Sequence, residues 1–429
     1  MLHDLTLDGF RSFSDSTAIK LAPLSIFAGP NNVGKSSVIQ ILLAFIQSKE
    51  ARSGANLLLS GPWCDLGLFD QVVTMSGRKF DHTFAVGLRA DSSGRQLQII
   101  EPSAFLDVMW RFGARQDDRS VARVEGIDYC CNDIAGKFIR DNLDETFTWT
   151  EERNDEMRSV GEIFLADPGS IAPIVMSGVS PLMAAALGQL FPVSVSRIHA
   201  IGPFRMPPQA VYAPRVAKVG PPIGRYGEHT AELLWRHRGQ LCDLVIPGAS
   251  EAKESRKPVL SALNDWWSYI FEGKLALQID VPARLGYTMA IDTPSADSLS
   301  LGQVGIGLSQ ALPIVATAVV SKPGDLVMIE TPEAHLHPGA QHRLANMIIE
   351  LARRGRQVIV ETHSEHIVNA VQLAVKNGFP VEQQSILFFG QDDGRTTVDP
   401  VPLDARGKVL RLYPGFFDQA MIDMAELLR

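Results

Sequence analysis

One nine-residue stretch constrains this chain more than any other. Residues 29–37 read Gly-Pro-Asn-Asn-Val-Gly-Lys-Ser-Ser and fit the pattern Gly-x-x-x-x-Gly-Lys-Ser. An apolar run over residues 24–28 precedes the stretch, and a helical pattern from Val38 follows it. Such a strand–loop–helix unit turns backbone N–H groups toward a phosphate at the positive end of the helix. A glycine turn before an ordinary helix has no use for a lysine and two hydroxyls, so the stretch predicts a phosphate-binding loop.

The side chains of this loop have separate predicted roles. Lys35 reaches the β- and γ-phosphates of a nucleotide, and Ser36 supplies a hydroxyl to Mg²⁺. The other predicted nucleotide-binding residues of the loop are Gly29, Pro30, Asn31, Asn32, Gly34 and Ser37. The loop therefore predicts a nucleotide and Mg²⁺ as cofactors.

Length and composition indicate a globular protein. With 429 residues, of which 45% are hydrophobic and 21% charged, the chain can bury a full core and suggests two or three lobes. No run of eighteen apolar residues and no signal-peptide pattern is present, so we expect a cytoplasmic protein without a membrane segment. The four cysteines form no Cys-x-x-Cys pair, which predicts reduced, mostly buried thiols. A net charge of −8 permits a nucleic-acid partner but does not indicate one.

The order of the patterns predicts a nucleotide-binding domain of the α/β class that is split in sequence. Residues 1–102 form its N-terminal part, in which a hairpin leads into the phosphate-binding loop. Residues 103–190 read as an inserted, mainly helical lobe, because runs such as residues 180–187 look helical. Residues 191–294 form a connecting α/β segment, and residues 295–429 form the C-terminal part with a C-terminal helix. The absence of a long heptad repeat argues against an extended coiled-coil arm.

A second part of the predicted site lies in the C-terminal region. Residues 299–315 read as a small-residue loop that opens an apolar helix, in which Gly305, Gly307 and Ser309 can close on a phosphate. A buried strand over residues 326–329 then delivers Glu330, the predicted Mg²⁺-side carboxylate, to the edge where parallel sheets bind ligands. A second strand, over residues 357–360, ends close to His363 and is expected to bring this histidine to the same edge of the sheet.

Three histidines in this region allow a metal-site interpretation, which ranks second. They are His335, His337 and His363, with Glu330 and Glu333 as companions. Two histidines at i and i+2 in a turn do not chelate as His-x-x-x-His does on a helix, and the position of His363 suits a γ-phosphate contact equally well.

Other polar and aromatic residues carry weaker signals. Two interpretations suit Arg205 and Arg225 equally well: a contact with a phosphate or a partner, or a solvated side chain beside a turn. Gln71 is better explained as a surface glutamine than as a Mg²⁺ or phosphate sensor. Trp266 and Trp267 have the spacing of core residues rather than of a base-stacking platform.

Several motifs together resemble the ABC-type ATPases of the SMC/RecF class, in particular the soluble branch that includes the OLD (overcoming lysogenisation defect) proteins. The resemblance covers roughly residues 1–75 and 295–390, with traces at 202–205, 227–228 and 412–418. The motifs are Asp8-Gly9-Phe10-Arg11-Ser12-Phe13, the phosphate-binding loop, Gly305-Ile306-Gly307-Leu308-Ser309-Gln310-Ala311-Leu312-Pro313, Glu330-Thr331-Pro332-Glu333-Ala334-His335-Leu336-His337-Pro338 and Glu361-Thr362-His363-Ser364.

This resemblance implies the P-loop fold of an ABC-type ATPase head, with a mixed sheet and an antiparallel β-subdomain. It also implies ATP and Mg²⁺ as cofactors and a homodimer or higher homo-oligomer of heads. Two ATP molecules are sandwiched between two heads, and the signature loop from Gly305 to Ser309 of one subunit closes on the γ-phosphate held by the other. His363 is then the switch histidine, and Arg11 joins the nucleotide-binding residues. The chain has Thr331 where relatives carry the carboxylate that polarises the attacking water, so Glu333 is the nearest substitute, and the predicted catalytic residues are Glu330, Glu333 and His363.

The resemblance leaves two functions open. The first is an ATP-gated ATPase that acts in DNA maintenance or anti-phage defence with a separately encoded effector. The alternative is a non-hydrolysing, nucleotide-dependent scaffold that assembles a partner complex. A transporter ATPase is disfavoured because Leu-Ser-Gly-Gly-Gln is absent, and a small-molecule kinase because it has no use for the signature loop and His363. We expect no nuclease activity in the chain itself, since no acidic cluster follows the last sheet strand.

Overall fold

A computed structural model shows a chain that divides into two compact units, each assembled from distant segments. The described residues are 1–51, 56–76, 79–80, 83–91, 105–115, 117–131, 134–140, 146–153, 156–164, 195–215, 219–248, 256–282, 286–417, 423–424 and 426–427. Unit 1 comprises Met1–Ala22, Asn32–Val195 and Phe389–Val398, and unit 2 comprises Pro23–Asn31, Ser196–Phe388 and Asp399–Arg429. Along the chain, the phosphate-binding loop passes from unit 2 to unit 1 between Asn31 and Asn32.

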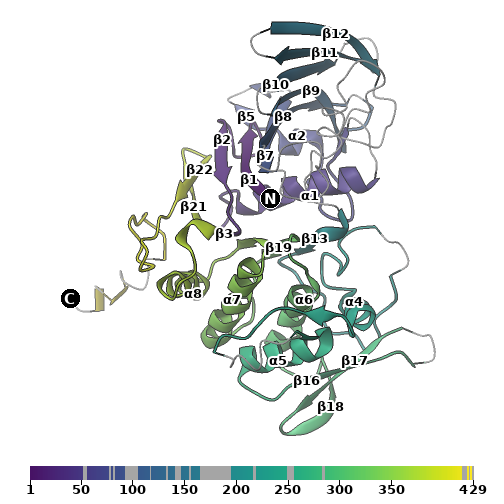
Figure 1. The fold of residues 1–429 in the computed structure, drawn as a ribbon, viewed down its shortest axis with the longest axis vertical. Helices are drawn as coiled ribbons and strands as arrows, with labels where there is room; N and C mark the ends of the chain where they lie inside the picture. Colours follow the sequence, from purple (N-terminus) through teal and green to yellow (C-terminus); the bar gives the residue numbers. More distant parts are fainter. Residues whose placement is uncertain are drawn as a thin grey trace. The chain divides into compact units, whose positions relative to one another are not determined.

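Unit 1 is built on one antiparallel sheet with the strand order β12-β11-β10-β9-β8-β7-β1-β2, and β4 pairs with β9 (Figure 1). On β8, every second residue from Leu106 to Phe112 is buried, which is the period of a sheet with one covered face. The strands are β1 (Leu2–Asp8), β2 (Thr17–Lys20), β4 (Asn56–Leu58), β7 (Thr83–Asp91), β8 (Phe105–Ala114), β9 (Val121–Cys131), β10 (Ile134–Arg140), β11 (Thr146–Arg153) and β12 (Glu156–Phe164).

Helix α1 (Lys35–Ala51), which follows the phosphate-binding loop, packs on this sheet. The ring of Phe45 meets Trp110 edge to face at 4.9 Å and Phe112 at 5.8 Å between centroids. All three side chains are almost completely buried. Aromatic burial of this kind fastens the helix to the strands, and the predicted antiparallel β-subdomain is confirmed.

The predicted helical lobe over residues 103–190 is wrong for the part that the structure describes. The described residues between 105 and 164 form the strands β8 to β12 and include no helix. The prediction gave weight to charged turns and helix-tolerant residues and overlooked the two-residue alternation of β8, which decides between strand and helix. The run over residues 180–187 lies outside the described residues.

Unit 2 contains a sheet with the order β13-β19-β20-β3-β21-β22. The strands from β13 to β21 pair in parallel. Every residue of β3, β19 and β20 is buried, which explains why these strands are mainly apolar. The strands are β3 (Leu24–Ala28), β13 (Ile198–Ile201), β19 (Leu326–Glu330), β20 (Gln357–Glu361), β21 (Gln384–Asp392) and β22 (Arg395–Pro400), and the last two run on into the segment Phe389–Val398 of unit 1.

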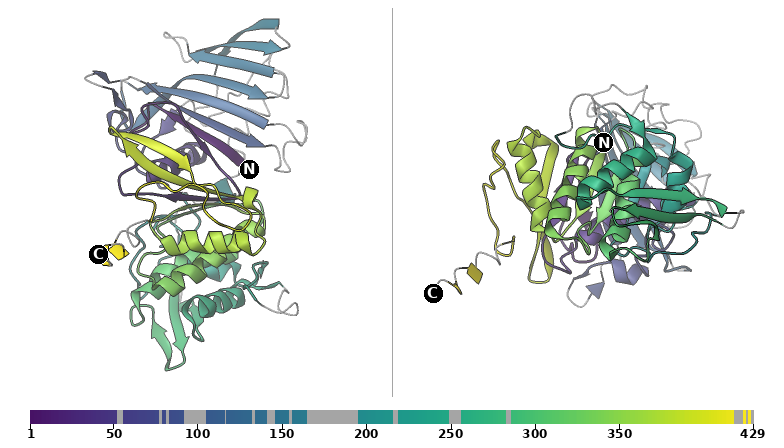
Figure 2. Two further views of the ribbon diagram at one scale, coloured as in Figure 1. Left: turned by 90° about the vertical axis from the view of Figure 1, so that its left-hand side faces the viewer. Right: turned by 90° about the horizontal axis from the view of Figure 1, so that it is seen from below.

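Helices cover one face of this parallel sheet (Figures 1 and 2). Trp266 and Trp267 are buried in their core, as predicted. The chain after β22 returns to the sheet, where Phe388 stacks on Tyr413 at 5.8 Å and meets Phe416 at 5.7 Å. No described helix is long and apolar enough to cross a bilayer. The helices are α4 (Thr230–His237), α5 (Val259–Phe271), α6 (Ile306–Val320), α7 (Pro338–Arg353) and α8 (Glu365–Lys376), and a small sheet joins β16 (Ala276–Asp280), β17 (Thr288–Thr293) and β18 (Ala296–Ser300).

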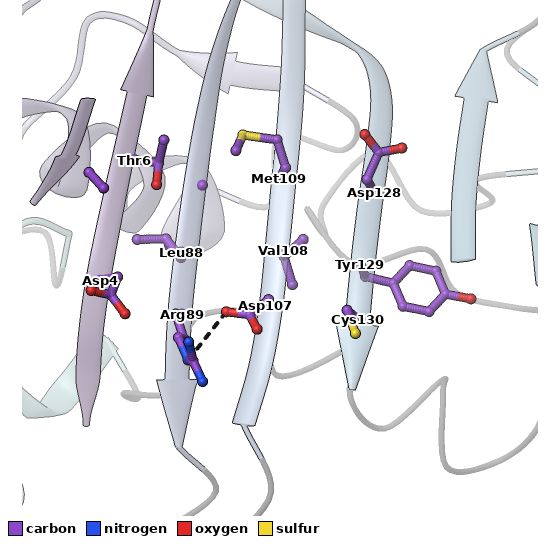
Figure 3. A pocket seen from close by; sticks show the side chains of 12 residues that line it. Asp4, Thr6, Leu88, Arg89, Asp107, Val108, Met109, Asp128, Tyr129 and Cys130 are labelled. Carbon is purple, nitrogen blue, oxygen red and sulfur yellow. Dashed lines mark ion pairs between the residues drawn. The ribbon is translucent and has the colours of Figure 1, made fainter. Parts of the chain in front are cut away.

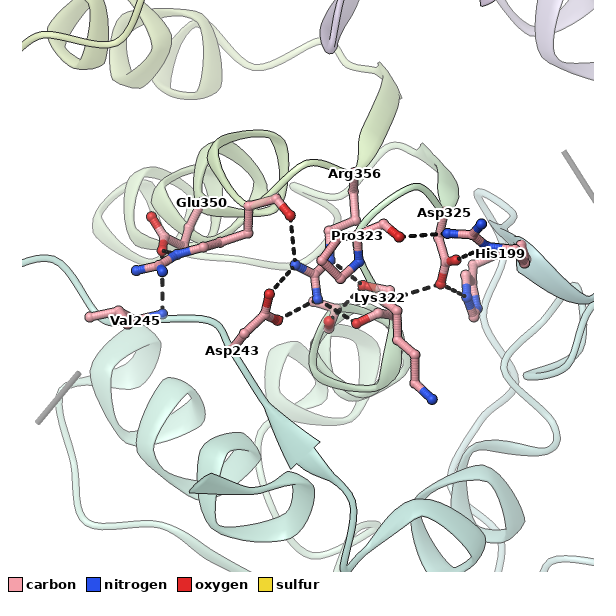
Figure 4. A network of polar contacts seen from close by, with 12 residues as sticks. His199, Asp243, Val245, Lys322, Pro323, Asp325, Glu350 and Arg356 are labelled. Carbon is pink, nitrogen blue, oxygen red and sulfur yellow. Dashed lines mark hydrogen bonds and ion pairs between the residues drawn. The ribbon is translucent and has the colours of Figure 1, made fainter. Parts of the chain in front are cut away.

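Paired charges fix the residues that precede β19 and β20 (Figure 4). Arg356 is buried and donates to both carboxylate oxygens of Asp243, at 2.8 and 2.5 Å. Asp325 accepts from Arg197 at 2.9 Å and lies 3.1 Å from the His199 ring nitrogen. Burial alone would raise the pKa of Asp325, but these hydrogen bonds lower it below its usual value. The amino ends of the central strands are thus held by structural ion pairs.

Candidate functional site

The carboxyl ends of three neighbouring parallel strands bring predicted site residues together in unit 2. Glu330 at the end of β19 is in register with Glu361 at the end of β20, and Glu361 is in register with Phe27 on β3. The first residues of the phosphate-binding loop follow β3 directly. Glu330 therefore lies at the sheet edge that the sequence predicted. Glu361 was not a predicted site residue, although it ends a buried apolar strand in the same way as Glu330.

The phosphate-binding loop has the backbone that an anion cradle requires. Residues with positive φ recur along it, at Gly29 (141°), Asn32 (63°) and Gly34 (94°). Such alternation lets successive N–H groups face one concave side. A Cβ on Gly34 would lie 2.9 Å from the Thr396 hydroxyl and 3.0 Å from the Phe13 ring, so the close packing of the loop admits only glycine there. These features fit a bound phosphate.

The first turn of α1 carries the remaining loop residues, all in unit 1. Lys35 and Ser37 are buried, and Ser36 is partly exposed. The Arg11 guanidinium donates to the Ser37 hydroxyl at 3.2 Å and to the Gln40 side chain at 2.6 Å. Burial lowers the pKa of Arg11. The structure thus places Arg11 beside the helix that begins with Lys35, and its part in nucleotide binding stays a prediction.

Two arginines contact the strand end that carries Glu330. Arg225 forms an ion pair with the Glu330 carboxylate. Arg205 donates to the backbone carbonyls of Glu330 at 2.7 Å and Thr331 at 3.0 Å. Burial lowers the pKa of Arg205 to about 10, against the opposing effect of Glu333 and Glu330. The interpretation of these arginines as solvated side chains beside a turn is therefore wrong.

Glu333 joins the loop after β19 to the loop after β20. One of its carboxylate oxygens accepts from the Thr362 hydroxyl at 2.9 Å, and the other accepts from the His363 backbone N–H at 2.6 Å. The His363 side chain is exposed, and Thr331 and His335 have left-handed backbone with φ of 43° and 61°. Both oxygens of the predicted substitute base thus hold the segment that carries the predicted switch histidine.

The predicted signature loop forms the start of α6. Gly305 is the N-cap residue, and no side chain caps the first turn. The Ser309 hydroxyl donates to the Ile306 carbonyl of its own helix at 2.9 Å. A Cβ on Gly307 would lie 2.6 Å from the His335 carbonyl oxygen, so this glycine allows α6 to pack on the loop after β19. The groups that this segment can offer a phosphate are the backbone N–H groups of its first turn rather than the Ser309 hydroxyl.

The metal-site interpretation of the histidines gains no support. His337 is the N-cap of α7, where its Nδ1 accepts from the Gly339 N–H at 3.3 Å, and His335 is exposed. Within the described ranges, no three His, Cys, Asp or Glu residues gather in a group that could hold a metal. Gln71 accepts from the Leu68 N–H at 2.8 Å and closes a local turn, as expected of a surface glutamine.

A hollow of about 410 Å³ lies over β1, β7, β8 and β9 of unit 1 and contains no predicted site residue (Figure 3). Its lining mixes both charges, and Arg89 lies 3.6 Å from Asp107. Burial raises the pKa of Asp107 despite Arg89. None of the residues that line the hollow belongs to the phosphate-binding loop.

Comparisons with known proteins agree with the fold and the motifs. Residues 1–91 and 247–368 match the family model described as AAA ATPase domain, and residues 380–427 match a family described as a protein of unknown function, DUF3696. No curated protein matches the sequence.

Solved structures of SMC heads match the chain over most of its length, and the first of them shows a similar fold. The SMC head bound to the C-winged helix domain of ScpA is 12% identical with a TM-score of 0.51, and the match covers 94% of this chain and 98% of that chain. The SMC head domain from Thermotoga maritima is 11% identical with a TM-score of 0.42, covering 94% and 99%. The SMC head with an extended coiled coil and the C-terminal domain of ScpA, derived from Pyrococcus furiosus, is 12% identical with a TM-score of 0.49, covering 100% and 99%.

The fold is that of an SMC head, and residues 1–91 and 247–368 have the sequence features of an AAA ATPase domain. The two matched segments are separated in sequence by residues 92–246, which include the strands β8 to β12.

Proposed function

We propose that the protein binds and slowly hydrolyses Mg·ATP, and that ATP pairs two heads that act with a separately encoded effector in DNA maintenance or anti-phage defence. The observation that carries the nucleotide site is the register that sets Glu330 and Glu361 beside the strand leading into the phosphate-binding loop. The biological role follows the resemblance to the OLD branch.

The proposed work of each residue follows from its position. Lys35 and the backbone N–H groups of the loop bind the phosphates, and Ser36 with Glu330 holds the metal ion, which neutralises phosphate charge when bound. Glu333 holds the backbone of His363 through its 2.6 Å hydrogen bond. Since Thr331 supplies no carboxylate directly after Glu330, we expect hydrolysis to be slow.

The start of α6 supports the proposed pairing of heads. Gly305 is exposed, and 56% of Ile306 is exposed, so the uncapped first turn is accessible to a second copy. A helix N-terminus attracts an anion, and the γ-phosphate held by another head is such an anion. An SMC head of the same fold binds a domain of ScpA, which is compatible with a separate protein partner for this chain.

The alternative function is a nucleotide-dependent scaffold that does not hydrolyse ATP. Two features favour the scaffold. Thr331 supplies no carboxylate to activate water, and both carboxylate oxygens of Glu333 already accept hydrogen bonds, from Thr362 and His363. Steady-state phosphate release by the wild type and by Lys35→Ala separates the two functions. We expect release above the Lys35→Ala background, and release equal to that background would support the scaffold.

Complementation tests the pairing of heads. Ile306→Glu places a negative charge where a phosphate would approach, and an acidic residue in the first turn is compatible with the helix. We expect Ile306→Glu and Lys35→Ala chains to be inactive alone and to regain phosphate release when mixed, because the mixed dimer has one intact composite site. The neutral variant Ile306→Gln is the matched control and should stay active. Mixing without recovery would contradict closure by a second copy.

A further inference from the structure

Arg225 and Arg205 have buried N–H donors without acceptors. Arg205 is 94% buried, and its Nε and Nη1 have no hydrogen-bond partner among the described residues; the same holds for Nη1 of Arg225. Buried guanidinium donors are normally paired because their desolvation is costly. Both guanidiniums lie at the Glu330 strand end. Their unused donors therefore indicate an additional anionic acceptor at this point of unit 2.

The loop that carries Arg225 is held in place by close backbone contacts. The Gly202 N–H donates to the Arg225 carbonyl at 2.9 Å, and a Cβ on Gly202 would lie 3.3 Å from the Arg225 guanidinium carbon. Gly227, with φ of 76°, packs so closely on α6 that a Cβ would lie 2.6 Å from Pro313. The backbone of Arg225 is thus fixed, while Glu330 is the one ion-pair partner of its side chain among the described residues.

Arg225 and a bound metal ion would compete for the same group, the carboxylate of Glu330. Glu330 is the proposed Mg²⁺-side carboxylate, and 3% of its side chain is exposed. A divalent cation at this carboxylate repels the guanidinium and removes its counter-charge, and a buried unpaired cation is strongly unfavourable. Mg²⁺ held by Glu330 would neutralise charge on the terminal phosphates of a bound nucleotide. If the metal displaces the guanidinium from Glu330, the guanidinium requires a new anionic acceptor. The terminal phosphate of a bound nucleotide would supply such oxygens.

We propose that Arg225 exchanges partners at this site: when Glu330 holds Mg²⁺, the Arg225 guanidinium donates to the terminal phosphate of ATP, while Arg205 stays on the strand end. This inference rests on the proposed function and deepens it, because it makes Arg225 the residue that distinguishes ATP from ADP. Arginine suits this role since its planar donors match phosphate oxygens and stay charged when buried.

Equilibrium binding of fluorescent ATP and ADP analogues, each with Mg²⁺, tests the proposal without any turnover. A hydrogen bond to a charged oxygen corresponds to about a 10- to 100-fold change in affinity. We expect Arg225→Ala to lose about that much ATP affinity while its ADP affinity stays within about twofold of the wild type, and Arg225→Lys to keep part of the preference. The matched control Arg354→Ala, which removes an ion pair with Glu350 elsewhere in unit 2, should change neither affinity.

A Mg²⁺ titration of ADP binding supplies a second readout. Because Arg225 competes with the metal for Glu330, Arg225→Ala should lower the Mg²⁺ concentration for half-maximal ADP binding, which a purely structural arginine would not do. Equal loss of both nucleotides in Arg225→Ala, or an unchanged ratio of ATP to ADP affinity, overturns the proposal and leaves the proposed function standing. A wild type that binds neither analogue overturns both.

Discussion

Glu333 is predicted to act as a clamp on the switch loop rather than as the general base. Its two carboxylate oxygens accept from the Thr362 hydroxyl and the His363 N–H, at 2.9 and 2.6 Å. Replacing Glu333 by alanine removes both acceptors. The loop that carries His363 should then open more often, because no described group takes their place.

The size of this effect follows from the two hydrogen bonds. Each bond to a charged acceptor contributes about 1.5–3 kcal/mol when it is shielded from water. His363 is exposed, so water replaces its partner at small cost, and the buried Thr362 hydroxyl still accepts from the Ser364 N–H at 3.0 Å. We therefore take a total below that of two shielded bonds, about 2 kcal/mol, which is roughly a 30-fold change in the local opening equilibrium.

Backbone hydrogen exchange of residues 361–368 measures this opening directly. We expect Glu333→Ala to accelerate exchange of the His363 amide about 30-fold, and Glu333→Gln, which keeps one acceptor oxygen, to accelerate it less and to retain phosphate release. Glu365→Ala is the control, since the ion pair that Glu365 forms is with its own neighbour His366. Unchanged exchange in Glu333→Ala, with phosphate release abolished in Glu333→Gln, would refute the clamp and support the base.

Three further predictions concern stability. Gly307→Ala drives a Cβ to 2.6 Å from the His335 carbonyl and should cost about 1–3 kcal/mol in urea unfolding, and an unchanged midpoint would contradict the packing. Phe45→Ala removes the aromatic contacts of α1 and should cost about 3–5 kcal/mol, so a loss below about 1 kcal/mol would speak against them. His199 and other hydrogen-bond donors lower the pKa of Asp325, so its contribution to the free energy of unfolding is present above the ordinary pKa of 3.8 and is lost as pH falls through the lowered pKa. The wild type should therefore lose stability more steeply below about pH 4 than Asp325→Asn, and equal slopes would contradict this.

The parts of the site that sequence predicted are those encoded locally. The loop over residues 29–37 and the placement of Glu330 depend on glycine spacing and on a buried apolar run that ends in a carboxylate, and both appear in a short window. The strands β3, β19 and β20 were recognisable for the same reason, since burial on both faces leaves a mainly apolar run without polar alternation.

The parts that sequence did not predict depend on distant partners. Arg225 meets Glu330 across 105 positions of sequence, and no local pattern names that partner. The roles of Glu333 and Gly307 likewise arise from loops that come together only in the folded unit. The strands from β8 to β12 were mistaken for helix because charged turns hid their alternation, although β8 shows it clearly once burial is known.

Binding of Mg·ATP to the wild type and to Lys35→Ala, measured by titration calorimetry, tests the central claim most directly. Lys35 begins the helix at the phosphate-binding loop, and its loss removes a charged donor to the phosphates. We predict that the wild type binds Mg·ATP and that Lys35→Ala binds it about 10- to 100-fold more weakly while remaining folded. Equal affinity of the two proteins, or no binding by a folded wild type, would contradict the assignment of this chain as an ATP-binding head.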